Sequence, residues 1–198
     1  QHGFSVKMYY DGDQILFPMQ KHTNKVINTD DVDHEYSDGI VTTQTSQRIG
    51  IKTADCLPML FYESTKHIAA AVHAGWIGTT TRIAEQAVRV ILELGGKAEN
   101  LYVSFGPSIE FDCYDIPEDR AELIMKKIGS NRNYIKKKKG EYYFSLVNVN
   151  YDQLRRIGIP KEQIEMNPWC TFCNDWSYSR RRDKGSEKGQ NISFIELM

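Results

Sequence analysis

Two side chains with reactive chemistry stand at the ends of two neighbouring apolar segments. Cys56 immediately precedes the apolar residues 57–62, and His73 immediately follows the apolar residues 68–72. The polar residues 63–67 separate the two segments, which is typical of two buried strands joined by a short loop. In such a hairpin the start of the first strand pairs with the end of the second, so we expect the thiol and the imidazole to lie close together.

A glycine-containing segment follows this hairpin. Gly75 and Gly78 precede Thr79 in AGWIGT, and apolar residues then recur at helical spacing. We predict a loop at residues 75–79 that leads into a helix over residues 79–95, which a pair of glycines ends. Backbone amides that converge where a loop enters a helix can bind an anion.

The segments that must position these residues are mainly strands in the first half of the chain and helices in the second. Short apolar or alternating segments bounded by turn residues predict strands at 5–10 and 14–18 as a hairpin, and at 25–28, 38–43, 48–53, 57–62, 68–72, 101–105 and 193–197. Helical spacing predicts helices at 79–95, at 118–128 with Leu123 on the apolar side, and at 149–157 capped by Asn148. We therefore expect an α+β fold, with mixed, largely antiparallel sheets and α-helices packed outside, in a single domain over residues 1–198.

Composition narrows the kinds of partner. The chain has 198 residues, a formal net charge of -1 and a pI of about 6.6. Balanced charge argues against nucleic acid or an anionic membrane as the main partner, and we expect a small-molecule ligand. No apolar segment reaches the roughly 18 residues of a membrane span and no signal-peptide core is present, so we expect a cytoplasmic protein. The first three residues lack an initiator methionine and are excluded from function.

The four cysteines are too few and too scattered for a disulfide framework, so we expect reduced thiols that are available for metal binding or catalysis. Cys170 and Cys173 have the spacing of a zinc knuckle. No second CxxC pair follows them, so the signal for a structural zinc site is weak. Cys113 lies in the loop over residues 106–117, where a packing thiol is favoured over a second nucleophile.

Three polar segments have more than one interpretation. His22 precedes a predicted strand, and on its own it is more often a solvated loop residue. His34 lies in the acidic segment 31–37, which is interpreted as solvated surface rather than as a metal site. Lysines in 135–144 are typical of a soluble sheet edge and only weakly suggest nucleic-acid binding.

Several motifs together resemble one family, the laccase-domain proteins once called polyphenol oxidoreductases and now regarded as purine nucleoside phosphorylases. The resemblance covers most of the chain and rests on six motifs: KHTNKV, DGIVTT, TADCLP, AAVHAGWIGT, GPSIEFDCYDI and SYSRRRDKG. The resemblance implies a zinc ion held by His22, Cys56 and His73, which would also be the catalytic residues. Two imidazoles and one thiolate leave a fourth tetrahedral position open, as in catalytic zinc sites. Copper is an alternative ion for the same ligands.

The resemblance also implies an activity: phosphorolysis of adenosine, inosine and 5′-methylthioadenosine, and deamination of adenosine. Purine nucleosides and phosphate are then the expected small-molecule partners. Guanidinium groups bind phosphate through paired hydrogen bonds, although a solvated arginine cluster is an equal alternative. Ile77 stands where the family usually has arginine, which removes one candidate cation. We expect phosphate to be bound by Gly75, Gly78, Thr79, Arg181 and Arg182.

Other activities make different demands on the sequence. A multicopper oxidase needs more imidazoles than five histidines supply, and no HxH pair is present, which argues against that activity. The main alternative is a metal-free hydrolase or deamidase, with Cys56 as nucleophile and His73 as base, similar to toxin deamidases. Such an enzyme would not need His22. A non-enzymatic nucleotide-binding protein, using only the glycines and arginines, would not need Cys56.

Overall fold

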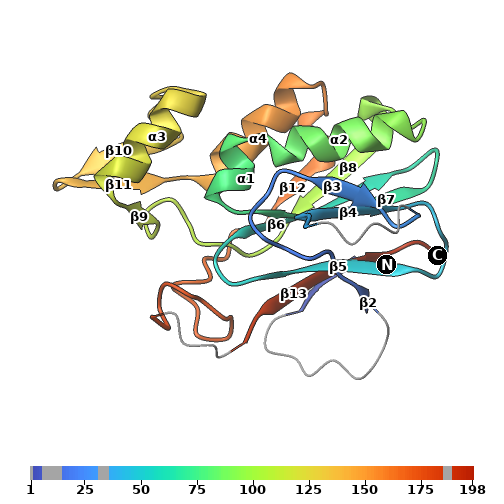
Figure 1. The fold of residues 1–198 in the computed structure, drawn as a ribbon, viewed down its shortest axis with the longest axis horizontal. Helices are drawn as coiled ribbons and strands as arrows, with labels where there is room; N and C mark the ends of the chain where they lie inside the picture. The colour runs from blue at the N-terminus through green and yellow to red at the C-terminus, as the bar shows by residue number, and fades with distance from the viewer. Residues whose placement is uncertain (1, 6–14, 31–35, 185–188) are drawn as a thin grey trace.

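A six-stranded sheet forms the middle layer of the protein (Figure 1). The computed structural model describes residues 2–5, 15–30, 36–184 and 189–198. The sheet is mostly antiparallel, with parallel pairs at its two edges. Its strands, in spatial order, are β12 (Ile164–Met166), β8 (Leu101–Phe105), β6 (Leu57–Glu63), β7 (Ile68–Ala74), β4 (Gly39–Thr42) and β3 (Val26–Asn28).

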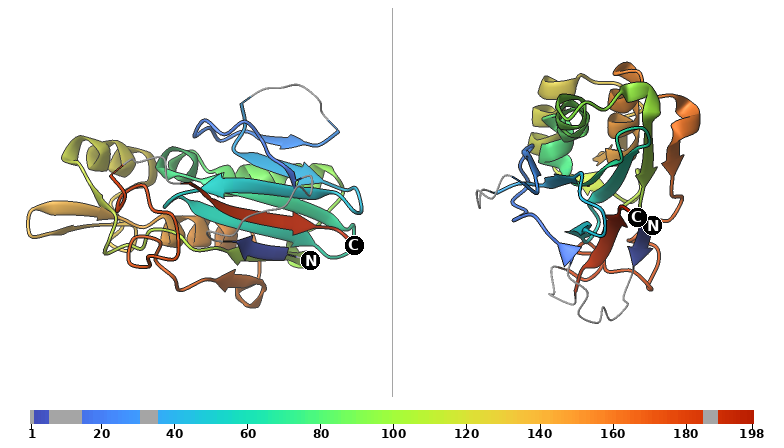
Figure 2. Two further views of the ribbon diagram at one scale, coloured as in Figure 1. Left: turned by 90° about the horizontal axis from the view of Figure 1, so that it is seen from below. Right: turned by 90° about the vertical axis from the view of Figure 1, so that its right-hand side faces the viewer.

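Helices cover one face of this sheet, and a second sheet covers the other (Figures 1 and 2). The helices are α1 (Trp76–Thr80), α2 (Ile83–Glu93), α3 (Glu118–Ile128) and α4 (Leu146–Arg156). The second sheet has the order β1 (His2–Ser5), β13 (Asn191–Glu196), β5 (Arg48–Thr53) and β2 (Ile15–Leu16). A third sheet lies beside α3 and consists of β10 (Ile135–Lys138), β11 (Glu141–Phe144) and β9 (Asp115–Ile116).

The three layers follow from the alternation of side chains along the central strands. Successive residues of a strand point to opposite faces. Met59 and Phe61 of β6 accordingly pack in the core under the helices, whereas Leu60 packs in the core between the two sheets. Both faces of β6 and β7 are buried, which explains why these strands are continuously apolar instead of alternating.

The structure confirms the predicted fold class, with mixed, largely antiparallel sheets and α-helices outside them. It also confirms the 57–62 and 68–72 hairpin as β6 and β7, and the C-terminal strand, which pairs with β5. The prediction missed β12. The proposed hairpin of 5–10 with 14–18 falls largely outside the described residues, as does the acidic segment around His34.

The predicted helix over 79–95 was wrong at its start, because two helices meet there. Arg82 has a left-handed φ of 65° between α1 and α2. The hydroxyls of Thr80 and Thr81 both donate to the carbonyl oxygen of Ile77. Such side-chain bonds to the preceding turn compete with a regular helix, which accounts for the break.

Two local predictions about the other helices were also wrong. Helix α4 begins earlier than expected, and Ser145 caps it by accepting a hydrogen bond from the backbone N–H of Asn148. Leu123 of α3 is exposed, and the buried side of that helix consists of Ala121 and Ile124. Within the described residues, no helix is both long enough and apolar enough to cross a membrane.

Candidate active site

The central hairpin brings Cys56 and His73 together, as its register requires. Pro58 of β6 pairs with His73 of β7, and Cys56 immediately precedes β6. His22 reaches the same place from the loop before β3, where it has a left-handed φ of 59°. Its Nε2 lies 4.0 Å from Cys56 Sγ, and its ring centroid lies 4.9 Å from that of His73. One ligand atom from each of the three residues lies within 4.8 Å of the other two.

A buried carboxylate, that of Asp38, positions both histidines. Its Oδ1 lies 2.6 Å from His73 Nδ1, and the same oxygen accepts the backbone N–H of His22 at 3.0 Å. The other oxygen accepts the backbone N–H of Lys21 and both the N–H and the hydroxyl of Thr23. A carboxylate on Nδ1 fixes the orientation of an imidazole and leaves Nε2 for a ligand. Asp38 therefore fixes the His73 ring and the backbone of the loop that carries His22.

The thiol and the imidazole stabilise each other's charged forms. Burial alone would raise the pKa of Cys56, but the charge of His73 and hydrogen bonds from both histidines lower that pKa to about 6. Burial would lower the pKa of His73, but the charge of Cys56 and the hydrogen bond to Asp38 raise it to about 9. The cysteine is thus a thiolate at neutral pH, and a thiolate is both a metal ligand and a nucleophile.

The three residues fit a metal ion with an open coordination position. Tetrahedral zinc with bonds of about 2.0 to 2.3 Å places neighbouring ligand atoms about 3.5 Å apart, close to the 4.0 Å between Cys56 Sγ and His22 Nε2. The Asp38–His73 pair supplies the hydrogen bond that metal-bound imidazoles usually have. Gly75 leaves space for this group, since a Cβ atom there would lie 2.8 Å from the His22 ring and 3.3 Å from Cys56 Sγ.

A cavity of about 700 Å³ opens above Cys56 and His22. Apolar and aromatic side chains form part of its wall, including Trp76, Ile109 and Tyr114. Burial and the charge of Cys56 raise the pKa of Tyr114 to about 12, so its hydroxyl keeps its proton. Five basic residues also line the cavity: Lys21, Arg120, Arg180, Arg181 and Lys184.

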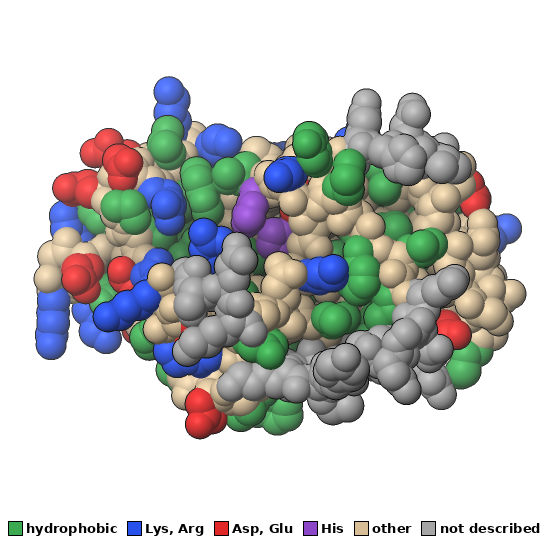
Figure 3. Space-filling view, turned by 60° about the horizontal axis from the view of Figure 1, so that its bottom comes forward, with side chains coloured by type: hydrophobic (Ala, Val, Ile, Leu, Met, Phe, Trp, Pro, Cys, Tyr) green, Lys and Arg blue, Asp and Glu red, His purple; other side chains and the backbone are tan. Residues whose placement is uncertain are grey.

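The charge on this cavity is strongly unbalanced. Asp55 is the acidic residue among the described lining residues, and its carboxylate already accepts hydrogen bonds from the protein. Figure 3 shows histidine side chains on this face with lysine and arginine side chains close by. The cavity therefore suits an anion next to a flat, apolar group.

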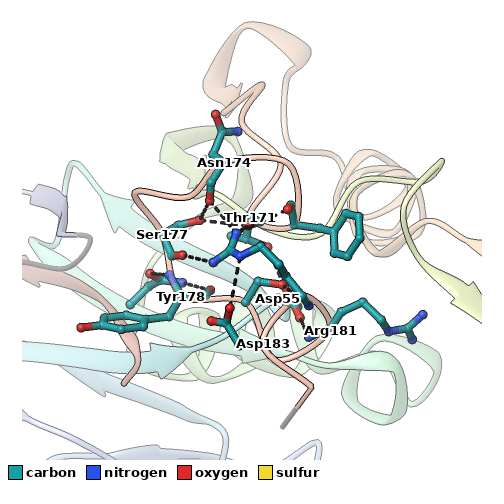
Figure 4. A network of polar contacts seen from close by, with 11 residues as sticks. Asp55, Thr171, Asn174, Ser177, Tyr178, Arg181 and Asp183 are labelled. Carbon is teal, nitrogen blue, oxygen red and sulfur yellow. Dashed lines mark hydrogen bonds and ion pairs between the residues drawn. The ribbon is translucent and has the colours of Figure 1, made fainter. Parts of the chain in front are cut away.

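Asp55 joins the loop before β6 to the C-terminal loop that carries the arginines (Figure 4). Its carboxylate accepts the hydroxyl of Thr171 at 2.7 Å and the backbone N–H of Arg181 at 2.7 Å. These bonds place the Arg181 side chain on the cavity wall, where its guanidinium contacts Asp115 and lies 5.6 Å from the centre of the Tyr114 ring.

The structure separates Arg182 from Arg181. The Arg182 guanidinium donates to the carbonyl oxygens of Thr171, Asn174 and Ser177 and pairs with Asp183. It does not line the cavity. These donors hold the loop together, so the structure does not bring Arg182 to the cavity, and the expectation that it binds phosphate stays a prediction.

The predicted loop at residues 75–79 was wrong, because residues 76–80 form helix α1. Gly78 and Thr79 are buried in that helix and do not line the cavity. The Thr79 N–H donates to the Gly75 carbonyl oxygen, and its hydroxyl accepts from Asn150. The polar groups of Thr79 are thus bonded within the protein.

Sequence reasoning missed several residues of this site. Asp38 begins the predicted strand 38–43 and Asp55 lies in the TADCLP motif, and neither is among the site residues predicted from the sequence. Tyr114 follows Cys113 in GPSIEFDCYDI, and Trp76 follows Gly75 in AAVHAGWIGT. Neither aromatic residue was predicted to belong to the site. Arg120 had no signal, since an arginine in the first turn of α3 is ordinary in an amphipathic helix.

A larger cavity of about 780 Å³ lies elsewhere, lined by residues of β6, β8 and the C-terminal segment. It contains His67, whose Nδ1 lies 2.9 Å from the Tyr62 hydroxyl. Neither group of potential metal ligands in the described residues lies there. We therefore assign the candidate active site from its chemistry and not from cavity size.

Curated relatives match nearly the whole chain. The chain is 29% identical over 205 residues to "Adenosine deaminase RL5" from an unknown prokaryotic organism, covering 96% of this chain and 78% of that protein. It is 30% identical over 200 residues to "Purine nucleoside phosphorylase YlmD" of Bacillus subtilis (strain 168), covering 92% of this chain and 70% of that protein.

A solved structure and a family profile agree with these matches. The fold superposes on the crystal structure of Bacillus licheniformis hypothetical protein YfiH with a TM-score of 0.84 and 28% identity, covering 93% of this chain and 74% of that one. The profile of the family described as multi-copper polyphenol oxidoreductase laccase matches residues 4–198. The chain therefore belongs to the multi-copper polyphenol oxidoreductase laccase family.

Proposed function

We propose that this protein is a zinc-dependent purine nucleoside phosphorylase that also deaminates adenosine. The observation that carries the proposal is the convergence of His22, Cys56 and His73 beside a cavity with aromatic walls and basic residues. The names of the similar proteins support the same two reactions. The proposed substrates are adenosine, inosine and 5′-methylthioadenosine, with phosphate as the second substrate for phosphorolysis.

The cavity matches the parts of these substrates. A volume of about 700 Å³ is in the range of small-molecule sites, which is about 300 to 1,000 Å³. Trp76 and Tyr114 offer aromatic surfaces for a purine ring. The basic residues Arg180, Arg181 and Lys184 come from one loop and offer a site for phosphate. We infer that Arg181 holds phosphate and that Gly75 contributes by leaving space for the ligands rather than by binding an anion.

The two reactions use these groups differently. In phosphorolysis a phosphate oxygen forms a bond to ribose C1′ while the bond from C1′ to purine N9 breaks, and the departing purine takes a proton. In deamination water adds to purine C6, and ammonia leaves. When bound, a divalent ion at the three ligands would supply Lewis-acid polarisation. Asp38 keeps His73 oriented in both reactions, and the basic residues concentrate phosphate in the first.

Copper is an alternative ion for the same three residues, since imidazole and thiolate also suit that ion.

A metal-free hydrolase or deamidase is a second candidate function, favoured by one observation. The lowered pKa of Cys56 and the raised pKa of His73 describe a thiolate–imidazolium pair, which is the resting form of many cysteine nucleophiles.

Product analysis tests the proposal directly. The zinc-loaded protein is incubated with each nucleoside, with and without phosphate, and the products are separated by chromatography. We expect free purine base and a ribose 1-phosphate, carrying the 5-methylthio group when the substrate is 5′-methylthioadenosine, only when phosphate is present. In the absence of phosphate we expect inosine and ammonia from adenosine. Zinc-loaded protein that releases neither base nor ammonia would contradict the proposed function.

Two neighbouring arginines give a matched test of the phosphate site. Arg181→Ala is expected to raise the KM for phosphate about tenfold or more, because a charge-assisted hydrogen bond contributes about 1.5 to 3 kcal/mol. The KM for the nucleoside should change much less. Steady-state kinetics at varied phosphate would measure both constants. Unchanged phosphate dependence would remove Arg181 from the site.

The control variants separate a local charge effect from a structural one. Arg89→Ala removes an exposed arginine of α2 that does not line the cavity and should change neither KM. Arg182→Ala should lower the melting temperature instead, because it leaves several loop carbonyl oxygens without their donor.

A further inference from the structure

Three cysteines from two loops that are far apart in sequence lie close together beside the candidate active site. Cys113 and Cys173 are 60 residues apart in sequence, and their Sγ atoms are 3.3 Å apart. Cys170 joins them, so that the three sulfur atoms all lie within 4.8 Å of one another. Cys170 is buried, Cys113 is half-buried and Cys173 is exposed. This cluster shares no residue with the His22, Cys56 and His73 group.

The surrounding backbone holds one of these sulfur atoms, that of Cys170, in place. Ser108 and Cys170 form a β-bridge, and the Thr171 N–H donates to the Ser108 carbonyl oxygen at 3.0 Å. The backbone N–H of Glu110 points at Cys170 Sγ, 3.4 Å away. Hydrogen bonds of this kind to sulfur orient thiolate ligands and stabilise their charge. The fold therefore fixes Cys170, the buried member of the cluster, and places the other two sulfur atoms beside it.

The geometry suits a thiophilic metal ion. In a tetrahedral zinc site with Zn–S bonds of about 2.3 Å, the sulfur atoms are about 3.8 Å apart. This distance lies between the 3.3 Å from Cys113 Sγ to Cys173 Sγ and the 4.8 Å within which all three sulfur atoms lie. Repulsion between adjacent thiolates makes such a group unfavourable without a cation, and a bound metal ion removes that repulsion.

We propose that Cys113, Cys170 and Cys173 bind a second metal ion, Zn²⁺, as three thiolates, with water at the fourth position on the side of the exposed Cys173. The ion would tie together two segments that line the active-site cavity. One carries Ile109 and Tyr114 and the other carries Arg181. Its role is thus to hold the cavity walls in place, while the first site supplies the chemistry. The inference does not depend on the proposed function.

Counting bound metal tests the proposal. Reduced protein is saturated with Zn²⁺, freed from excess ion by gel filtration, and analysed by mass spectrometry for zinc per chain. We expect two zinc ions for the wild type, one for Cys173→Ser and one for His22→Ala. The double variant should bind none. Equal zinc content in the wild type and Cys173→Ser would overturn the proposal.

Cobalt substitution identifies the ligands independently of the count. Co²⁺ bound at both sites should give thiolate-to-metal charge-transfer absorption, and Cys173→Ser should lose a larger share of it than Cys56→Ser, because three thiolates belong to the proposed site and one to the first. Circular dichroism checks that each variant is folded, and Cys113→Ser replaces any variant that is not.

A disulfide is the competing explanation for the short distance between Cys113 and Cys173. Thiol titration of the protein purified without reductant distinguishes the two. Four titratable thiols in the metal-stripped, denatured protein support the metal site. Two titratable thiols, together with a single bound zinc after reduction, would overturn it. Nucleoside assays are not needed here, so a protein that binds two zinc ions without cleaving nucleosides would contradict only the proposed function.

Discussion

His22→Ala should lose the zinc of the first site and reduce both nucleoside phosphorolysis and adenosine deamination by about a thousandfold or more. The variant keeps the thiol and the imidazole but has only two of three protein ligands, and metal assistance contributes several kcal/mol to such reactions. The measurements are zinc content and kcat/KM with adenosine, each with and without phosphate. Chelation of the wild type should have the same effect, and added Zn²⁺ should reverse it.

This variant also decides between the two mechanisms considered for Cys56. A metal-free cysteine hydrolase needs Cys56 and His73 but not a third ligand. Activity that survives His22→Ala and chelation, yet disappears in Cys56→Ala, would establish the metal-free enzyme and overturn the zinc proposal. His67→Ala is the matched control, since His67 lies in the loop between β6 and β7 and should leave metal content and activity unchanged.

Asp38→Asn is expected to weaken zinc binding at the first site by about 10- to 100-fold, the usual effect of removing the carboxylate behind a metal-bound histidine. The side chain keeps its shape, but every partner of this carboxylate is a donor. In asparagine, an NH2 group replaces one of the two accepting oxygens, so this donor would lie against other donors and some of the hydrogen bonds would be lost. Competition with a chelator of known affinity measures the change, and wild-type affinity in the variant would contradict the positioning role.

The same substitution should lower the unfolding free energy by about 3 kcal/mol at neutral pH, because a buried ion pair loses one charge. Burial would raise the pKa of Asp38, but hydrogen bonds from His73 and Thr23 lower it from 3.8 to about 2. A depressed pKa stabilises the folded protein above the unfolded value of 3.8, and that contribution disappears as the pH falls through about 2.

Acid denaturation therefore provides a second measurement of the same residue. The wild type should lose roughly 2 kcal/mol of stability through Asp38 between pH 4 and pH 2, and the variant should lack this part of the pH dependence. Asp119→Asn, at an exposed position of α3, should behave like the wild type. Parallel acid-denaturation curves for the wild type and Asp38→Asn would contradict the interpretation.

The sequence by itself determined the central hairpin and the meeting of Cys56 with His73. Continuous apolar segments of strand length, separated by a few polar residues, have few other ways to bury their side chains, and the register of an antiparallel pair then follows. The fold class and the strands that flank the hairpin followed from the same local patterns. The resemblance to a family added His22, which periodicity alone places in a solvated loop.

Only the tertiary structure decided which of the remaining candidates share a site. Arg181 and Arg182 are adjacent and chemically identical, yet one lines the cavity and the other holds a loop together. Asp38 became important because three loop amides and His73 converge on it, and Cys113 because it meets a CxxC pair from a distant loop. Contacts between distant segments depend on how the layers pack, and neither residue type nor local spacing carries that information.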